Sequence, residues 1–594
     1  MPWGRGAAPS GQRPEPGGGK VQVQNAEIAA VFYEIADLLE IENSNPFRIR
    51  AYRNAARTVQ MLAPNVQALV EAGRDLKELP GIGIELAERI AEVAEGGTCE
   101  LREQLRRELP PEIHRLLRIP GLGPKRVRLL YQERGIHTPE QLLRAAREGQ
   151  LRTIRGLGEK TEQRILEVVQ AQLSSERRFS IADAADMVEP LIGYLQELAA
   201  TGRVEAAGSY RRMKETVGDL DIVATSASTE QVTQHFVSYG LVAKVLSQGP
   251  TRASVELRNG MQVDLRVVAE PSFGAALHYF TGSKNHNIEV RKLAQKRGLK
   301  LNEYGMFSGE TPVAGETEEA VFTAVGLAFI EPELRENRGE IEAARDGRLP
   351  QLVALTDLKG DLHSHTTASD GRNSLREMAM AAQGRGMAYL GITEHSNSAG
   401  IARGLDAEQL ARHIDDIDKL NAGLDGITLL KGVEVDILED GRLDLPDSIL
   451  RQLDYAIGSV HSKFELTREA QTTRIMRAMD NPNIRILGHP IGRLLFVRQP
   501  YEVDMGRIIR HAKQCGCVLE LDSQPGRLDL NDSYCMLAKD EGVLISIDSD
   551  AHSTEDFDNL RFGVGQGRRG WLEKGDVLNT RTLEQVMLVL RERR

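Results

Sequence analysis

The chain has 594 residues, 41% of them hydrophobic and 27% charged, and its formal net charge is −11. This length corresponds to about four folded units at ~150 residues each, and the composition is that of a globular protein. The negative net charge excludes a protein coated on all sides by nucleic acid, but it is compatible with a local basic groove.

Membrane and secretory segments are not expected in this chain. The longest apolar stretch, residues 320–330, is much shorter than the ~20 residues that a membrane helix needs. Residues 1–19 are rich in Gly and Pro and lack the basic and apolar regions of a secretory signal, so we expect a disordered leader. The four cysteines form no C-x-x-C pair, and their scarcity favours a reducing cytoplasm.

The residue pattern changes along the chain, and this change predicts a multidomain protein. Helical periodicity broken at Gly and Pro is typical of the N-terminal part, whereas strands and helices alternate further on. We expect a helical domain at 20–97, a second helical region at 98–180, an α+β domain at 181–270, a helix-rich subdomain at 271–335, a charged linker with helical character at 336–355, and a distorted α/β barrel at 356–594.

One short pattern occurs three times in the helical region: an apolar residue, a Gly-x-Gly turn and then a helix with a basic or polar face. Closely spaced glycines let backbone N–H groups approach a ligand, and the following helix adds its positive N-terminal end. The pattern therefore suits a phosphate contact that reads no base sequence. A single copy could be a plain helix hairpin, but three copies resemble the helix-hairpin-helix motif of DNA-binding proteins. The glycines are Gly81 and Gly83, Gly121 and Gly123, and Gly156 and Gly158.

Two aspartates flank one leucine just before an apolar run in the segment ETVGDLDIVA, residues 215–224. On a β-strand the side chains of Asp219 and Asp221 point the same way, and two like charges on one face are costly without a cation between them. Mg²⁺ accepts hard oxygen ligands of this kind. A solvated turn before a buried strand is the alternative for a bare Asp-x-Asp, so the neighbouring residues decide.

A glycine–serine loop and a third aspartate accompany this pair. Gly208 lets the backbone and the Ser209 hydroxyl approach a phosphate, and Arg212 can add a charge-assisted contact. Asp264 lies in another strand-like run and, with the first two aspartates, would hold two Mg²⁺ (or Mn²⁺) ions that assist transfer of a nucleotide. This pattern resembles the nucleotidyltransferase superfamily.

The segment YFTGS, residues 279–283, narrows the resemblance to the DNA polymerase X family, over residues 21–335. The family makes 181–270 the nucleotidyltransferase palm and 271–335 the nucleotide- and template-binding thumb. It implies that Asp219, Asp221 and Asp264 are catalytic, that Ser209 and Arg212 contact the β- and γ-phosphates of a dNTP, that Tyr279, Phe280 and Gly282 flank its sugar, and that Asn287 reaches the incoming base and Arg291 the template strand. Core packing is the alternative for the two aromatic residues taken alone.

The first hairpin departs from this family at one position. Residues 45–59 and the hairpin after them resemble the family's small lyase domain, whose nucleophile is a lysine on the helix after the hairpin. Aligning the shared L-P-G-x-G segment places Arg89 there, and Glu85 where another DNA-contacting lysine is expected. Arginine stays protonated and cannot form a Schiff base. We therefore expect this domain to bind a 5′-phosphate but to lack lyase activity by that route.

Histidines and carboxylates follow short apolar runs throughout residues 356–594. Side chains at the C-terminal ends of strands meet on one face of an α/β barrel. A single histidine is more often structural than a metal ligand, but six histidines interleaved with three carboxylates favour a metal centre. They are His363, His365, Asp370, His395, Glu434, His461, His489, Asp550 and His552.

This set is similar to the ligands of the PHP (polymerase and histidinol phosphatase) family, over residues 356–594. The resemblance implies three divalent ions and phosphoester hydrolysis; the ligand types suit Zn²⁺, Mn²⁺ or Fe alike. It places His363, His365, Glu434 and Asp550 on one ion, Asp370, His395 and His552 on a second, and Glu434, His461 and His489 on the third, with Glu434 bridging. Arg493, just after a G-H-P turn, is a candidate for contacting the substrate phosphate.

Together these resemblances identify the chain as a member of the bacterial and archaeal type of the polymerase X family with a C-terminal PHP domain. They imply a cytoplasmic, nucleoid-associated repair polymerase, expected to be monomeric, that binds gapped primer–template DNA and dNTPs and fills short gaps in base excision repair. The PHP domain would act as a 3′–5′ exonuclease, and AP endonuclease activity stays open. The alternatives are a template-independent nucleotidyltransferase fused to a small-molecule phosphatase, and a DNA-binding scaffold, which the complete ligand sets disfavour.

Overall fold

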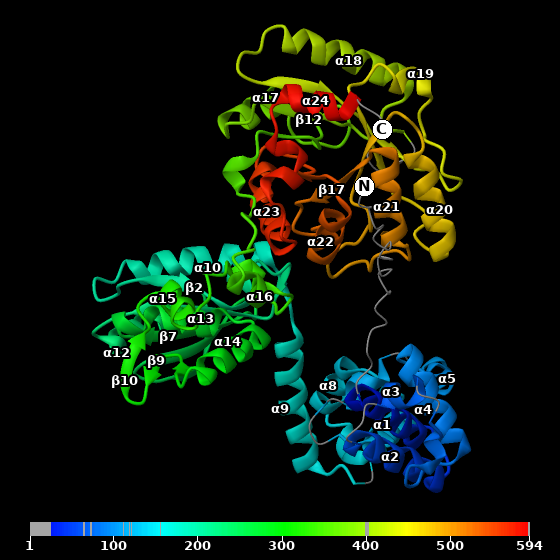
Figure 1. The fold of residues 1–594 in the computed structure, drawn as a ribbon, viewed down its shortest axis with the longest axis vertical. Coiled ribbons are helices and arrows are strands. Elements are labelled where there is room, and N and C mark those ends of the chain that lie inside the picture. The colour runs from blue at the N-terminus through cyan, green and yellow to red at the C-terminus, as the bar shows by residue number, and fades with distance from the viewer. Residues whose placement is uncertain are drawn as a thin grey trace, which may run out of the picture. The chain divides into compact units, whose positions relative to one another are not determined.

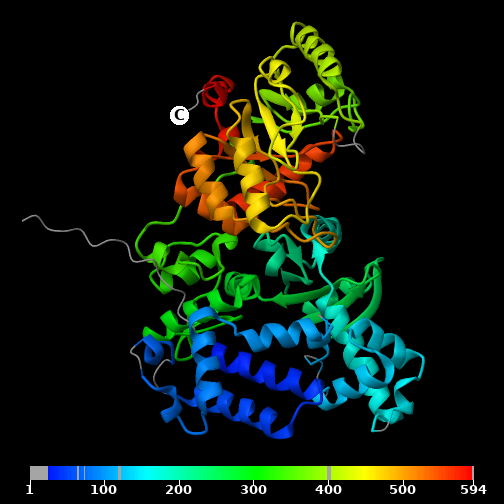
Figure 2. The same cartoon turned by 90° about the vertical axis from the view of Figure 1, so that its right-hand side faces the viewer.

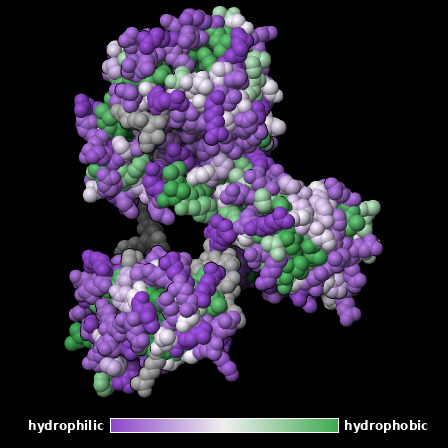
Figure 3. Space-filling view, turned by 180° about the vertical axis from the view of Figure 1, so that it is seen from behind, coloured by the Kyte–Doolittle hydropathy of each residue, from purple (hydrophilic) through white to green (hydrophobic). Residues whose placement is uncertain are grey.

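The computed structural model describes residues 25–62, 66–71, 74–110, 112–117, 119, 122–154, 156–397 and 403–591. The chain divides into two compact units, residues 1–177 and 178–594. The expected leader at 1–19 and Gly121 lie outside the described residues. Across the described ranges, no helix has the length and apolar character that crossing a membrane requires. In the view of Figure 3 the surface of each unit is mainly hydrophilic.

The first unit is built from helices, as the sequence predicts (Figure 1). Apolar residues at helical spacing meet in one core, in which Phe32, Ile35 and Tyr52 are buried. Left-handed glycines at Gly97 and Gly135 end two of the helices that follow the hairpins. The helices are α1 (Asn25–Ile41), α2 (Pro46–Met61), α3 (Val66–Glu71), α4 (Ile84–Gly96), α5 (Glu100–Glu108), α6 (Ile113–Leu117), α7 (Pro124–Arg134), α8 (Pro139–Arg147) and α9 (Glu159–Glu176).

The palm region of the second unit folds around a sheet with the strand order β2-β4-β7-β6-β5. Strands β4 and β7 are parallel neighbours, which places Asp221 opposite Asp264. Val188 and Leu191 of α10 pack into the core on one face of the sheet, and Phe273 of α13 packs against Val223 on the other. The elements are α10 (Ile181–Gln196), β2 (Val204–Ala206), α11 (Gly208–Arg211), β3 (Thr216–Val217), β4 (Asp219–Thr225), α12 (Thr229–Val237), β5 (Val242–Gln248), β6 (Arg252–Leu257), β7 (Gln262–Val268) and α13 (Phe273–Thr281).

The thumb region continues from α13 and includes the stretch that we expected to be a linker. Its elements are α14 (Lys284–Lys296), β8 (Lys300–Asn302), β9 (Gly305–Ser308), β10 (Thr311–Ala314), α15 (Glu318–Ala324) and α16 (Glu340–Arg345). Ile341 and Ala344 of α16 are buried in the same core as Val290 and Phe322. The prediction of a linker at 336–355 is therefore wrong for its first half, because the apolar face of this charged helix packs into the thumb.

The PHP region is built on parallel strands, with β11-β12-β13 in one sheet and β14-β15-β16-β17-β18 in another. Isolated parallel bridges join the two sheets on both sides, from Ser364 to Ala551 and from His395 to Glu434. Helices cover the outside of the strands (Figure 2), which agrees with the predicted distorted barrel. The strands are β11 (Gly360–Asp361), β12 (Tyr389–Ile392), β13 (Thr428–Lys431), β14 (Glu434–Asp436), β15 (Ala456–Ser459), β16 (Ile484–Leu487), β17 (Val518–Asp522) and β18 (Ile545–Asp548). The helices are α17 (Leu375–Gly384), α18 (Ala407–Asn421), α19 (Asp447–Leu450), α20 (Arg468–Met479), α21 (Met505–Cys515), α22 (Asp532–Glu541), α23 (Leu560–Arg569) and α24 (Leu583–Arg591).

The palm, thumb and PHP regions pack against one another within the second unit. Ile181 and Ala185 of α10 share a small buried cluster with Leu528 and Phe562 of the PHP region. Trp571, two residues after the end of α23, packs against the core of the thumb. The polymerase-like and PHP regions therefore form one compact body rather than two domains on a flexible tether.

Candidate DNA-binding and metal sites

The three glycine turns of the first unit share one local geometry. In each copy the apolar residue before the turn accepts a hydrogen bond from the backbone N–H three residues later: Ile82 to Leu79 at 3.1 Å, Leu122 to Ile119 at 3.0 Å and Leu157 to Ile154 at 3.0 Å. Gly81 and Gly156 have φ values of 77° and 90°, which favour glycine. A Cβ added at Gly83, Gly123 or Gly158 would meet nothing within 4 Å, so the start of each following helix is open to a ligand.

The position of the expected lyase nucleophile is occupied by an ion-paired arginine. Arg89 on α4 donates to the Glu92 carboxylate at 2.7 Å and is about one quarter exposed. Glu85, one turn earlier, accepts hydrogen bonds from the Arg48 guanidinium at 3.3 Å and from the Tyr52 hydroxyl at 3.2 Å. No neutral amine is therefore held at either of these two positions.

The palm carboxylates lie side by side at the start of two neighbouring strands. Burial, Asp219 and Asp264 together raise the pKa of Asp221 to about 7, and burial and Asp264 raise the pKa of Asp219. This mutual repulsion fits a site that receives divalent cations. The groups of possible metal-ligand atoms that lie within 4.8 Å of one another in the described residues do not include these three carboxylates. Asp264 is also hydrogen-bonded by the Ser254 hydroxyl.

The glycine–serine loop approaches these carboxylates from the side. Gly208 has a φ of 62°, and a Cβ there would lie 2.4 Å from Oδ2 of Asp221. Only glycine allows the start of α11 to come this close. Arg212, directly after α11, donates through Nη1 to the carbonyl of Thr281, and a Cβ at Gly282 would lie 3.2 Å from that nitrogen. Arg212 therefore links the loop to the end of α13.

The remaining predicted nucleotide and template residues gather around the end of α13 and the start of α14. The rings of Tyr279 and Phe280 lie 5.1 Å apart at 77°. Asn287 donates through Nδ2 to the carbonyl of Tyr279 at 2.7 Å, and the guanidinium of Arg291 lies 6.0 Å from the centre of the Tyr279 ring. Ser209 is half-buried in α11, beside Gly208.

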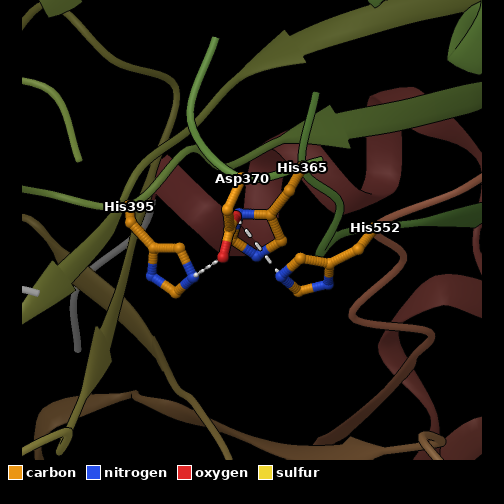
Figure 4. Close-up of side chains that lie close together, drawn as sticks. All are labelled: His365, Asp370, His395 and His552. Atoms are coloured by element: carbon orange, nitrogen blue, oxygen red, sulfur yellow. Dashed lines mark ion pairs between the residues drawn. The ribbon is translucent and has the colours of Figure 1, made fainter. Parts of the chain in front are cut away.

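The histidines and carboxylates of the PHP region meet at the ends of its strands. Figure 4 shows Asp370 between the rings of His395 and His552, with ion pairs of 3.5 and 3.4 Å, and His365 beside them. Glu434 lies at the centre of the whole set. Donor atoms lie within 4.8 Å of one another in three overlapping groups: His365, Asp370, His395 and His552; His363, His365 and Asp550; and His395, Glu434 and His461. The ninth predicted ligand, His489, contacts Glu434 at 2.9 Å.

Several polar atoms of this cluster face one another without hydrogen bonds. Nε2 of His363 and Oε2 of Glu434 are 3.6 Å apart, and both are buried without a hydrogen-bond partner. Burial acts to lower the pKa of His395, but Glu434 and Asp370 raise it to about 11. Unpartnered buried donors and acceptors cost free energy unless something else satisfies them. The residues present therefore fit the divalent ions that the ligand pattern implies.

Two buried carboxylates behind the cluster were missed by the sequence analysis. Glu520 of β17 contacts Nδ1 of His363 at 2.5 Å, and Asp436 of β14 contacts Nδ1 of His461 at 2.5 Å. Each contact fixes the ring and leaves Nε2 directed at the cluster, as carboxylates behind metal-ligating histidines do. The alternation of Glu434 and Asp436 on one strand was a signal that could have found the second of them.

Arg493 joins the PHP region to the palm region. Its guanidinium donates to the backbone carbonyls of Arg527 and Leu528 and pairs with Glu215 of the palm region at 2.7 Å. Only 8% of the side chain is exposed. The charge of Arg493 is therefore used to join the palm and PHP regions, which disfavours its predicted contact with a substrate phosphate.

Comparison with protein families matches separate parts of the chain. The matches are a helix-hairpin-helix domain at residues 23–99, a SAM-like helix-hairpin-helix tandem at 113–171, the DNA polymerase beta palm at 181–264, the DNA polymerase beta thumb at 276–336 and the PHP domain at 361–503. The PHP match ends before Asp550 and His552, which the structure nevertheless brings into the same cluster.

Three curated relatives match either most of the chain or about a third of it. A probable phosphatase of Thermoanaerobacter sp. (strain X514) is 30% identical over 37% of this chain and 89% of its own length, and one of Clostridium acetobutylicum is 30% identical over 32% and 78%. The DNA polymerase/3′-5′ exonuclease PolX of Bacillus subtilis (strain 168) is 36% identical over 95% of this chain and 99% of its own length. Such identity over the full length, with palm, thumb, hairpin and PHP domains all matched, shows that the chain belongs to the PolX family of DNA polymerases that carry a PHP domain.

Proposed function

We propose that this protein is a DNA-directed DNA polymerase that fills short gaps in base excision repair and that its PHP domain is a 3′–5′ exonuclease. The observation that carries the polymerase is the placement of Asp221 opposite Asp264, with Gly208 close enough that a Cβ would meet the Asp221 carboxylate. A phosphate-binding loop this close to paired carboxylates suits transfer of a nucleotide. Full-length relatedness to a named polymerase/exonuclease supports the same assignment.

We assign the palm carboxylates Asp219, Asp221 and Asp264 to Mg²⁺ or Mn²⁺, and the nine PHP residues to three divalent ions among Zn²⁺, Mn²⁺ and Fe. When bound, such ions supply Lewis-acid assistance to phosphoryl transfer. Ser209 and Arg212 would orient the triphosphate, and Tyr279 and Asn287 the sugar and base. We propose the sequence-derived boundaries for the domains, with α16 moved into the thumb, and a monomer in the cytoplasm with its four cysteines reduced.

Extension of a labelled primer on one-nucleotide-gapped DNA tests the polymerase. Incorporation of only the templated nucleotide is expected, with a matched control in which the template base is changed. Incorporation that ignores the template base would favour the template-independent nucleotidyltransferase instead. If nothing is incorporated in Mg²⁺ or Mn²⁺, a DNA-binding scaffold would be the only one of these three functions that remains for the palm.

The match to probable phosphatases keeps a small-molecule phosphatase as a second candidate for the PHP domain. Labelled DNA separates the two activities. An exonuclease releases nucleoside monophosphates from the 3′ end, whereas a phosphatase releases inorganic phosphate from a phosphomonoester and leaves the DNA at full length. Cleavage of an abasic-site duplex in the same assay tests the AP endonuclease activity.

Substituting Gly81 or Gly156 by alanine should weaken DNA binding whatever the base sequence. Both glycines have a positive φ, so alanine distorts a turn that presents backbone N–H groups to phosphate. The dependence of log Kd on log salt concentration should become shallower, because fewer phosphates are contacted. Titration of labelled duplexes at several salt concentrations measures both effects, with Gly97→Ala as a control at a helix end away from the hairpin turns. Altered sequence preference at unchanged affinity would contradict the backbone role.

Borohydride should trap no covalent adduct between this protein and a 5′-deoxyribose-phosphate end. Arg89 holds the expected place of the nucleophile and cannot form a Schiff base. Gel analysis after borohydride treatment of incised abasic-site DNA measures the adduct. A strong adduct would show that another amine acts. Lys77 is the first to test by Lys77→Ala, because it precedes the hairpin and is half exposed, where it pairs with Asp75 at 3.2 Å.

A further inference from the structure

Arg212, which we assign to the triphosphate of the nucleotide, is held by Glu336 of the thumb and by Thr281 at the end of α13. Its Nε donates to Oε1 of Glu336 at 3.0 Å, and its Nη1 donates to the carbonyl of Thr281. The side chains of Arg212 and Glu336 are only 13% and 14% exposed. An arginine has a long side chain that loses much conformational freedom on binding, so such anchors hold it in place before a ligand arrives.

A residue of the PHP domain also contacts Arg212 and Glu336. Nη1 of Arg569, the last residue of α23, donates to the same Oε1 of Glu336 at 2.9 Å and to the backbone carbonyl of Arg212 at 2.8 Å. Its Nη2 donates to Oδ2 of Asp532 at 2.7 Å, and its side chain is 3% exposed. Arg338 of the thumb also reaches Asp532, at 3.2 Å. A single buried side chain of the PHP domain thus contacts both Arg212 and the carboxylate that holds it.

The charges of this cluster do not balance. Two carboxylates, Glu336 and Asp532, lie among the cations of Arg212, Arg338, Arg569 and, at 3.9 Å from Glu336, Lys214. Burial acts to raise the pKa of Glu336, but the neighbouring cations lower it, so this carboxyl stays ionised. Ion pairs that serve only to join two domains need no surplus of positive charge, whereas a site for a polyanion does. Arg212 directly follows α11, whose first residue, Gly208, lies against the carboxylate of Asp221, so the surplus lies near the palm carboxylates.

We propose that Arg569 is a positioning residue for nucleotide binding: through Glu336 and the backbone of Arg212, the PHP domain orients the arginine that receives the triphosphate. This inference rests on the proposed polymerase function and on Arg212 as its triphosphate ligand. It makes the PHP domain part of the nucleotide site of the palm, independently of the metals of its own cluster.

The test compares Arg569→Gln with Arg568→Gln. Arg568 is the neighbouring residue of α23 and makes an ion pair of the same kind, to Glu333 of the thumb at 2.7 Å, without touching Glu336. Gap filling by one nucleotide on a saturating DNA substrate gives KM for the dNTP and kcat. We expect Arg569→Gln to raise KM roughly tenfold, which is what one charge-assisted hydrogen bond is worth. The Kd for DNA and the 3′–5′ exonuclease rate should stay within about twofold, and Arg568→Gln should leave KM within the same range.

A double-mutant cycle identifies the route of the effect. Glu336→Gln should raise KM to a similar extent, and the Arg569→Gln/Glu336→Gln protein should be no worse than the worse single variant, because both changes remove the same support. Arg569→Lys keeps the charge but cannot reach both carboxylates, so it should restore KM only in part. If Arg569→Gln does not fold, the KM values of Glu336→Gln and Arg569→Lys test the same inference.

An unchanged or lowered KM in Arg569→Gln overturns the inference, as do equal effects in Arg569→Gln and Arg568→Gln or strictly additive effects in the cycle. The wild-type protein separates this failure from failure of the proposed function. If the wild type fills gaps normally, only the role of Arg569 is wrong. If the wild type incorporates no dNTP, the polymerase assignment itself fails.

Discussion

Replacing Asp219 or Asp221 by alanine is expected to abolish nucleotide addition by this protein. The two carboxylates lie with Asp264 beside the glycine–serine loop, and burial with mutual repulsion raises the pKa of Asp221 to about 7. Loss of either ligand should weaken binding of the divalent ions that assist the transfer. An ion of this kind contributes several kcal/mol to the transition state, so a fall of at least ~10³-fold in the rate is expected.

Single-turnover extension of a gapped primer measures this effect, with Asp219→Asn and Asp221→Asn as variants that keep the size of the side chain. Asp186→Ala is the matched control, because Asp186 is an exposed aspartate on α10 of the same palm. DNA affinity and exonuclease rate should change little, since the hairpin turns and the PHP cluster use other residues. Near-normal extension by the Asp219→Ala/Asp221→Ala protein would refute the assignment of the polymerase site.

The sequence predicted the elements that local chemistry dictates. The glycine turns, the strands around the palm aspartates and the strand ends that carry the histidines all depend on residues within a few positions of one another. The nine PHP ligands were predicted because eight of them lie at or just beyond apolar runs. The structure brings eight of the nine into overlapping donor groups and places His489 against Glu434. Family resemblance assigned their roles; the residue pattern alone predicted that they would meet.

What the sequence could not predict depends on packing between distant segments. The charged stretch at 336–355 looks like a linker because only a few residues of α16 are apolar, yet Ile341 and Ala344 are enough to bury it in the thumb. Arg493 follows His489, a predicted metal ligand, by four residues, but its guanidinium pairs with Glu215, which is 278 positions earlier in the chain. The contacts of Arg569 with Glu336 and Arg212 likewise join segments far apart in sequence.

Replacing both His363 and His365 by alanine is expected to remove the exonuclease activity and leave the polymerase active. Both imidazoles are fully buried after β11, and both lie in a donor group with Asp550. The double change removes two of the four protein ligands proposed for one ion, so that ion should be lost. Because Glu434 is proposed to bind that ion together with a second one, 3′–5′ degradation and any abasic-site cleavage should fall together, by at least ~10³-fold.

Parallel primer extension and primer degradation by the same protein measure the separation, with the metal content determined by elemental analysis. His511→Ala is the control, because His511 lies in the same domain but pairs with Asp480 at 3.0 Å, outside the cluster. Full exonuclease activity in a variant that has lost metal would refute the assignment of the metal centre.

Polymerisation by the same double variant tests whether the PHP cluster supports the palm, because the two regions are packed together and are not held apart by a linker. Extension should stay within about twofold of the wild type, since the contacts between the regions run through Arg493, Phe562 and Arg569, and none of these residues is a ligand of the cluster. Loss of both activities in a folded protein would instead show that the metal-bound cluster stabilises the surface on which the palm rests. In that case the support that Arg569 gives to Arg212 would itself depend on the metals.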